Sequence, residues 1–237
     1  MVKESLKVGE IDVEVTFKDI KNLHLSVHPP YGKVTVSSPL FYDMDKVKIY
    51  VATKLNWIKK EQSKFINQLR EQPREFINQE THYFLGAKYL LLIKEGNRNK
   101  VVTDGNKLVV HTRDITNKVQ KEKQVYQFYR KELRYHLQRY ISIYSQRMGI
   151  ELPDFKIRVM RTKWGSCATT TKCLWFNIEL AKKPLDCIEY IVVHEMVHLF
   201  ERHHNKQFVL LMDEYLPNWR TQKKILNELA LPVYDVK

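Results

Sequence analysis

One pentapeptide constrains the fold of this chain more than any other feature. Residues 194–198 are His-Glu-Met-Val-His. On a helix, residues i and i+4 lie on one face about one turn apart, so both imidazoles could reach one metal ion. The positions just before the motif are apolar, which is typical of a buried helix: they are Ile188, Ile191, Val192 and Val193. The pattern predicts a core helix with a metal-binding face, and a coincidental match on a core helix is the alternative.

A third metal ligand is expected shortly after this helix. His204 lies six residues beyond His198, a spacing at which the chain can leave the helix and return another imidazole to the metal. Three protein ligands with one open position form the coordination of catalytic zinc, so Zn²⁺ is the expected cofactor. Metzincins have a glycine at this bend, but Glu201 stands here, so the turn must come from Arg202 and His203.

Carboxylates and cysteines give the alternatives for the metal site. Glu214 is the best placed carboxylate on a following helix to replace His204 as the third ligand, and Asp213 is the next. The three cysteines could form a structural zinc site with a histidine, although their spacing matches no standard pattern: they are Cys167, Cys173 and Cys187. Free thiols are the alternative for these cysteines.

Glu195 is the expected general base of a metal-dependent peptide hydrolysis. A carboxylate next to the ligands can take a proton from a water on the metal. Three polar side chains are candidates to bind the substrate and stabilise its oxyanion: Arg161, Tyr190 and His203. Asn177 and Asp213 could accept hydrogen bonds from the imidazole N–H groups.

A segment upstream of the histidines is a candidate substrate-binding edge. Residues 161–167 are Arg-Thr-Lys-Trp-Gly-Ser-Cys, and Leu-Trp-Phe-Asn follows at 174–177. An edge strand here, beside the histidine helix, could hold an extended peptide by strand addition. Trp164 and Gly165 predict a tight turn that places the Trp164 ring beside the cleft. An ordinary hairpin with a packed tryptophan is the alternative.

Apolar periodicity predicts a mixed α+β fold. Alternating residues predict a meander of three strands between 11 and 36 and a second group of short strands between 83 and 110. The expected helices span 44–69, 118–148 with Gly149 as C-cap, 185–202, 205–215 and 218–229. Two more strands are expected at 156–160 and 172–178. The layout predicts a strand-rich half with one long helix, 1–112, and a helical zinc-binding catalytic half, 113–237, packed as one unit.

Composition excludes several classes of protein. Hydrophobic residues make up 43% of the chain and charged residues 28%, which is typical of a globular protein. No apolar run approaches the roughly 18 residues of a membrane span, and the first residues lack the apolar core of a secretory signal. Three cysteines without a Cys-x-x-Cys pair fit a reducing compartment, so a cytoplasmic location is expected.

Positive charge gathers in the middle of the chain. Residues 51–150 carry 20 basic and 9 acidic residues, which would suit nucleic acid, although a solvated lysine-rich surface is the alternative. Four tyrosines of the 118–148 helix could stack on bases or belong to the core: Tyr129, Tyr135, Tyr140 and Tyr144. The second hypothesis is therefore a nucleic-acid-associated protein, whose metal site acts on DNA-bound proteins or serves only for binding.

Together, the motifs resemble those of a known family. The stretches R-T-K-W-G-S-C, L-W-F-N, H-E-M-V-H-L-F-E-R-H-H-N-K-Q-F and L-P-N-W-R are similar to the YgjP-like metallopeptidases, relatives of the SprT-like zincins. The resemblance implies a zincin-like core of helices and a small sheet, with zinc held by His194, His198 and His204. It implies that Glu195 is the base, and that His203 replaces an asparagine of the family pattern without loss of a ligand. The implied activity is that of a zinc metallopeptidase acting on proteins or peptides; the physiological substrate and the oligomeric state do not follow from it.

Overall fold

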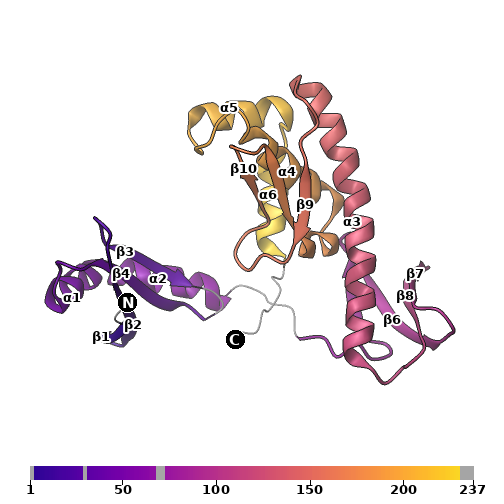
Figure 1. Ribbon diagram of the computed structural model, residues 1–237, viewed down its shortest axis with the longest axis horizontal. Helices are drawn as coiled ribbons and strands as arrows, with labels where there is room; N and C mark the ends of the chain where they lie inside the picture. Colours follow the sequence, from indigo (N-terminus) through magenta and orange to yellow (C-terminus); the bar gives the residue numbers. More distant parts are fainter. Residues whose placement is uncertain (1–2, 29–30, 68–72, 230–237) are drawn as a thin grey trace. The chain divides into compact units, whose positions relative to one another are not determined.

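The chain forms two compact units. The computed structural model describes residues 3–28, 31–67 and 73–229, and the units span Met1–Arg70 and Glu71–Lys237 (Figure 1). The division expected from the sequence falls at residue 112, inside the second unit. Residues on either side of that point, such as Val110 and Val125, share one hydrophobic core. A boundary at 112 would therefore cut through a continuous core, whereas residue 70 separates two cores.

The N-terminal unit contains a four-stranded sheet. Its strands are β1 (Lys3–Val8), β2 (Ile11–Lys18), β3 (His24–His28) and β4 (Lys33–Pro39), in the order β1-β2-β4-β3. The predicted meander is wrong, because β4 lies between β2 and β3 and runs parallel to β2. The sequence pattern also missed β1, whose side chains are mostly exposed and polar.

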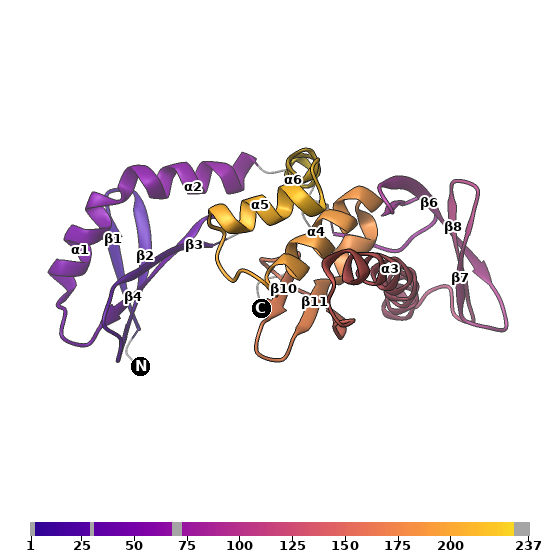
Figure 2. The ribbon, with the colours of Figure 1, turned by 90° about the horizontal axis from the view of Figure 1, so that it is seen from above.

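Two helices complete this unit and lie along the sheet (Figure 2). The predicted helix over 44–69 is divided at Lys54 into α1 (Met44–Thr53) and α2 (Leu55–Asn67); residues 68 and 69 lie outside the described residues. Both helices bury apolar side chains in the sheet's core: Val47, Val51 and Ile58. These positions would also share one face of an unbroken helix, so periodicity could not reveal the break.

The C-terminal unit contains two sheets. The first has β5 (Thr81–Phe84), β6 (Ala87–Glu95), β7 (Lys100–Asp104) and β8 (Lys107–Thr112), in the order β5-β6-β8-β7. The second has β9 (Phe155–Arg158), β10 (Gly165–Ala168) and β11 (Cys173–Asn177), in the order β10-β11-β9. The predicted strand groups are confirmed, and β10, which occupies an edge of its sheet, overlaps the segment 161–167 in which an edge strand was expected.

Four helices complete the C-terminal unit. They are α3 (Lys118–Met148), α4 (Leu185–Val197), α5 (Lys206–Tyr215) and α6 (Trp219–Glu228), and a 3₁₀ segment, Ile178–Lys182, precedes α4. The predicted bounds of α3 are confirmed, and Gly149 caps it in the left-handed conformation with φ +64°. Figure 1 shows the first sheet near one end of α3 and α4 beside its other part. None of the helices described has both the length and the apolar character needed to cross a bilayer.

The α3 tyrosines divide between core and surface. Tyr129 and Tyr144 are buried, and their hydroxyls donate hydrogen bonds to the Tyr83 carbonyl (2.9 Å) and to Glu189 Oε1 (2.8 Å). Tyr140 is half-buried and Tyr135 is exposed. The buried rings of Tyr129 and Tyr144 therefore cannot stack on bases. The nucleic-acid hypothesis stays a prediction.

The C-terminal unit begins with a loop folded around Glu80. Its carboxylate accepts hydrogen bonds from the backbone N–H groups of Glu75 (2.8 Å) and Phe76 (2.9 Å) and from His82 Nε2 (2.8 Å). Burial alone would raise the pKa of Glu80, but these hydrogen bonds outweigh it and hold the pKa below its usual 4.5. Burial lowers the pKa of His82, so at neutral pH a neutral imidazole donates to the carboxylate.

Replacing Glu80 with glutamine should lower the free energy of unfolding at pH 7 by about 1–2 kcal/mol, because an amide NH₂ must then face a backbone N–H. The lowered pKa means that Glu80 stabilises the fold above its unfolded pKa and ceases to do so as falling pH protonates it. The difference from the wild type should therefore shrink below about pH 4. Urea unfolding at two pH values measures this difference in the free energy of unfolding. Glu95→Gln, at the exposed end of β6, is the control. A loss independent of pH would contradict this account.

Candidate metal centre

Helix α4 and its C-cap residue supply two of the three histidines. Its inward side chains are buried, which fixes the helix in the core and directs His194 toward a cleft: they include Ile188, Val192 and Val193. The helix ends at Val197, earlier than the predicted residue 202, but His198 keeps helical backbone angles of φ −64° and ψ −14°. His198 therefore stays on the same face as His194, one turn away, and their ring centroids are 5.0 Å apart.

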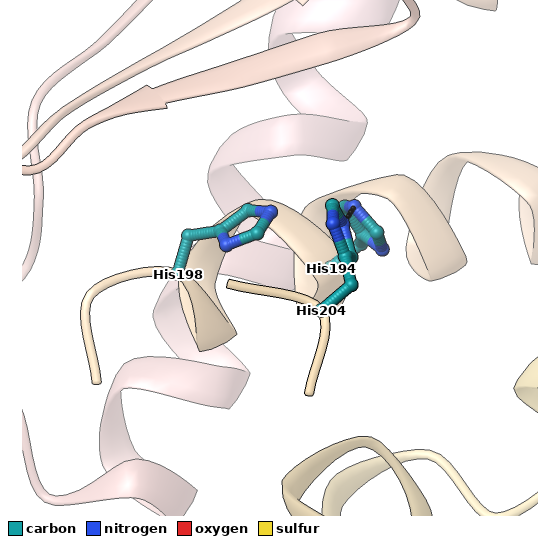
Figure 3. A group of neighbouring side chains, drawn as sticks. All are labelled: His194, His198 and His204. Atoms are coloured by element: carbon teal, nitrogen blue, oxygen red, sulfur yellow. Dashed lines mark hydrogen bonds between the residues drawn. The ribbon is translucent and has the colours of Figure 1, made fainter. Parts of the chain in front are cut away.

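His204 reaches the same point from the loop between α4 and α5 (Figure 3). This loop turns without glycine because its own side chains hold it. Glu201 Oε1 accepts a hydrogen bond from the His203 backbone N–H (2.9 Å), and the Asn205 side chain caps α5 by accepting one from the Phe208 N–H (3.0 Å). The bend that the sequence left to Arg202 and His203 thus depends on Glu201 and Asn205.

The three imidazoles converge on one position. One nitrogen of each ring lies within 4.8 Å of the others, and His194 Nε2 is 3.0 Å from His204 Nε2. Two ligands of a tetrahedral zinc ion lie roughly 3.3 Å apart, which is close to this spacing. Phe208 packs against all three rings, with centroid distances of 4.6–5.0 Å. The rings are therefore held together by packing.

The protonation of these imidazoles suits metal binding. His198 Nδ1 lies 3.0 Å from the Glu201 carbonyl, which can only accept, so Nδ1 carries the proton and Nε2 keeps its lone pair. Burial lowers the pKa of His194 to about 3, and the charges of His198, His204 and Lys223 add to the effect. A metal ligand must be a neutral imidazole, and these two are neutral at physiological pH. The residues present therefore fit a divalent metal ion.

Glu195 lies beside the histidines with its carboxylate in the cleft. The residue is buried, and Gly165 of β10 packs so closely that a Cβ at position 165 would stand 2.7 Å from Glu195 Oε1. Burial raises the pKa of Glu195 to about 8, and the positive charge of Lys163 opposes the rise. A divalent cation held by the neighbouring histidines would lower this pKa through its positive charge and so favour the carboxylate form that a general base requires.

The close approach predicts that Gly165→Ala displaces the Glu195 carboxylate. Proteolytic activity should fall by about 100-fold, because a shift of about 1 Å in a catalytic group has an effect of that size. Metal content and thermal stability should change little, since a flexible carboxylate gives way. Assays of activity, metal content and melting temperature measure these effects. Gly96→Ala is the control, because its added Cβ would meet its nearest neighbour at an ordinary 3.5 Å. Unchanged activity would contradict the placement of Glu195.

The histidines and Glu195 line a cleft of about 660 Å³ in the C-terminal unit. Among the candidates from the sequence, Trp164 and Tyr190 line this cleft. Arg161 and His203 are exposed and do not line it. The structure thus places two of the four substrate-binding candidates at the site and two outside it.

The alternative ligands and partners lie elsewhere. Asp213 accepts hydrogen bonds from Trp219 Nε1 (2.8 Å) and from Arg220, and Glu214 is exposed. Asn177 supports the loop before β10, donating from its amide to the carbonyls of Met160 (2.7 Å) and Lys163 (3.0 Å). In the described part of the chain, neither carboxylate and no cysteine belongs to a group that could hold a metal.

Three positively charged cleft residues were absent from the sequence-based candidates. They are Lys163, Arg202 and Lys223, from the loop before β10, the loop after α4 and helix α6. Lys163 and Arg202 are adjacent in sequence to the candidates Trp164 and His203. That proximity could have indicated that they lie at the cleft. Nothing in the local sequence marks Lys223, because only the packing of α6 against α4 brings it to the cleft.

The fold and the site define a class of protein. A mixed α+β chain with a His-Glu-x-x-His helix and a third converging histidine has the arrangement of a zincin metallopeptidase. The chain belongs to the YgjP-like metallopeptidase domain family, whose model matches residues 21–229. Its domain is that of a peptide hydrolase. No curated protein matches the sequence.

Two solved structures show partial similarity. The metallopeptidase zymogen of Methanocaldococcus jannaschii jannalysin is 19% identical, with a TM-score of 0.35 over 38% of this chain and 92% of that chain. The metallopeptidase zymogen of Pyrococcus abyssi abylysin is 15% identical, with a TM-score of 0.37 over 41% of this chain and 99% of that chain. The family match carries the classification.

Proposed function

We propose that the protein is a zinc-dependent peptidase in which His194, His198 and His204 hold the metal. The observation that carries this proposal is the convergence of three imidazole nitrogens within 4.8 Å of one another, in the cleft that also holds the Glu195 carboxylate. Three imidazole nitrogen ligands leave one coordination position open, as in catalytic zinc sites. Zinc is favoured over harder cations because all three ligands are imidazoles.

Glu195 is the proposed general base. When bound, zinc would supply the Lewis acidity that makes a water acidic and a carbonyl electrophilic. Glu195 takes the proton of the attacking water and returns it to the leaving amine, so that one carboxylate serves as base and then as acid. No hydrogen-bonding partner among the described residues occupies its carboxylate, which leaves both oxygens available for these transfers.

Tyr190 is the proposed stabiliser of the oxyanion that forms during attack. Its side chain lines the cleft, and its ring centroid lies 5.8 Å from that of His194. Burial raises the pKa of Tyr190 to about 12, and the Glu195 charge adds to the rise. The phenol therefore keeps its proton at neutral pH and can donate a hydrogen bond to the oxyanion.

Strand β10 is the proposed docking edge for the peptide. It is an edge strand, paired with β11 on one side only, and all four of its residues line the cleft beside Glu195. An extended peptide can add to such an edge through main-chain hydrogen bonds. This arrangement would carry the scissile bond past Glu195 and the three histidines.

Removal of the metal tests the proposal. Dialysis against a chelator should abolish cleavage of an unfolded protein such as casein, and one equivalent of zinc should restore it. Circular dichroism of the metal-free protein should remain close to that of the loaded protein, because extensive packing already supports α4. Full activity after complete metal removal would refute the proposed function.

A further inference from the structure

Positive side chains line the cleft that holds the metal centre. Lys163, Arg202 and Lys223 line the cleft, and each comes from a different element. Glu195 is the one acidic residue among the described cleft-lining residues. The cleft therefore carries more positive charge than its general base can balance.

The two lysines lie on elements that pack against the centre. Lys163 lies just before β10, whose Gly165 is in close contact with the Glu195 side chain, and Lys223 lies on α6, which packs against α4. Lys223 Nζ also lies 5.6 Å from the Trp219 ring, which stacks on Tyr190 with an interplanar angle of 10°.

Among the described residues, no acidic partner neutralises these cations. Within the described ranges, no carboxylate forms an ion pair with Lys163, Arg202 or Lys223. Other cations of the same unit are paired, since Lys182 lies 2.7 Å from Glu179 and Arg220 pairs with Asp213. The unpaired charges thus gather where a substrate would lie, and a carboxylate on that substrate would neutralise them.

We propose that this cleft selects peptides bearing carboxylates close to the scissile bond. The inference rests on the proposed function and specifies its substrate class. Acidic side chains and a free C-terminal carboxylate offer the same chemistry to Lys163, Arg202 and Lys223. A peptide lying along β10 would bring either kind of carboxylate within reach of cations from more than one element.

Peptide binding tests the selection independently of catalysis. Fluorescence anisotropy on the wild-type protein, kept in chelator so that nothing is cleaved, compares peptides with Glu, Gln or Lys flanking one constant centre. Each peptide is made with a free and an amidated C-terminus, which separates the two sources of carboxylate. The Glu peptide, the free-acid form or both should bind about tenfold more tightly than the amidated Gln peptide, and the Lys peptide most weakly. Added salt should weaken the preference.

Adjacent lysines of α6 provide the matched variants. Lys223→Glu should remove the preference or reverse it toward Lys peptides, a change of about tenfold. Lys224→Glu makes the same charge change at the next residue, which does not line the cleft, and should keep the wild-type preference. A second cleft variant, Lys163→Gln, should weaken the binding of acidic peptides with little effect on the amidated Gln peptide.

The outcomes separate this inference from the proposed function. Equal binding of Glu, Gln and Lys peptides together with equal binding of their free-acid and amidated forms, or equal effects of Lys223→Glu and Lys224→Glu, would overturn the inference even if the zinc-loaded protein cleaves them all. Binding of an oligonucleotide that depends on Lys223, with no preference among peptides, would also overturn it. Selective binding without cleavage after zinc loading would support the inference and count against the proposed function.

Discussion

Glu195→Gln should lower the proteolytic kcat by about 1000-fold or more while leaving one metal ion bound per chain. Glutamine has nearly the shape of glutamate but cannot accept a proton from the attacking water. The side chain touches the reacting position and is not one of the three imidazoles, so metal binding should survive. Steady-state kinetics on a fluorogenic peptide and metal analysis of the same preparation measure the two effects together.

Glu214→Gln is the control for this variant. It makes the same chemical change in an exposed carboxylate of α5 that does not line the cleft, so it should keep full activity. If Glu195→Gln kept more than about a tenth of the activity, general-base catalysis by this residue would be excluded. Loss of metal from Glu195→Gln would instead show that the carboxylate supports the metal.

His204→Ala should weaken zinc binding by at least about 100-fold, since a site of three imidazoles becomes a site of two. His204 approaches His194 to 3.0 Å between their Nε2 atoms, and no carboxylate in the described part of the chain belongs to the same group of ligand atoms. Competition with a chromophoric chelator gives the affinity, and activity at low free zinc should fall in parallel.

His203→Ala separates ligand loss from disturbance of the loop. His203 is the adjacent residue, is exposed and does not line the cleft, so its replacement should leave the zinc affinity unchanged. Retention of wild-type affinity by His204→Ala would contradict the assignment of the third ligand. In that case Glu214→Ala would show whether a rearranged α5 supplies a carboxylate.

Local sequence patterns predicted helix α3 and the face that two of the metal-site histidines share. The bounds of α3 and its Gly149 cap follow from apolar spacing and a single glycine, and the His-Glu-x-x-His spacing determines that His194 and His198 share a face. These features depend on neighbours within a turn or two. The convergence of His204 was also expected, although the side chains that form its bend were not.

Tertiary packing determined what the sequence could not show. The parallel pairing of β2 with β4 depends on contacts between separated segments, so alternation alone suggested a meander. Helix α3 packs against both sheets of the C-terminal unit and joins them in one core. The boundary between the two units therefore falls before these sheets, at residue 70. Likewise, Arg161 was a candidate from the sequence and Lys163 was not, whereas the path of the loop decides which side chain faces the cleft.

X-ray absorption at the zinc K-edge of the zinc-loaded protein reports the ligands of the metal. We expect about three imidazole nitrogens and one further light atom at roughly 2.0 Å from the metal. Sulfur at roughly 2.3 Å, as from Cys167, or a first shell with fewer than three imidazoles would contradict the proposed centre of His194, His198 and His204.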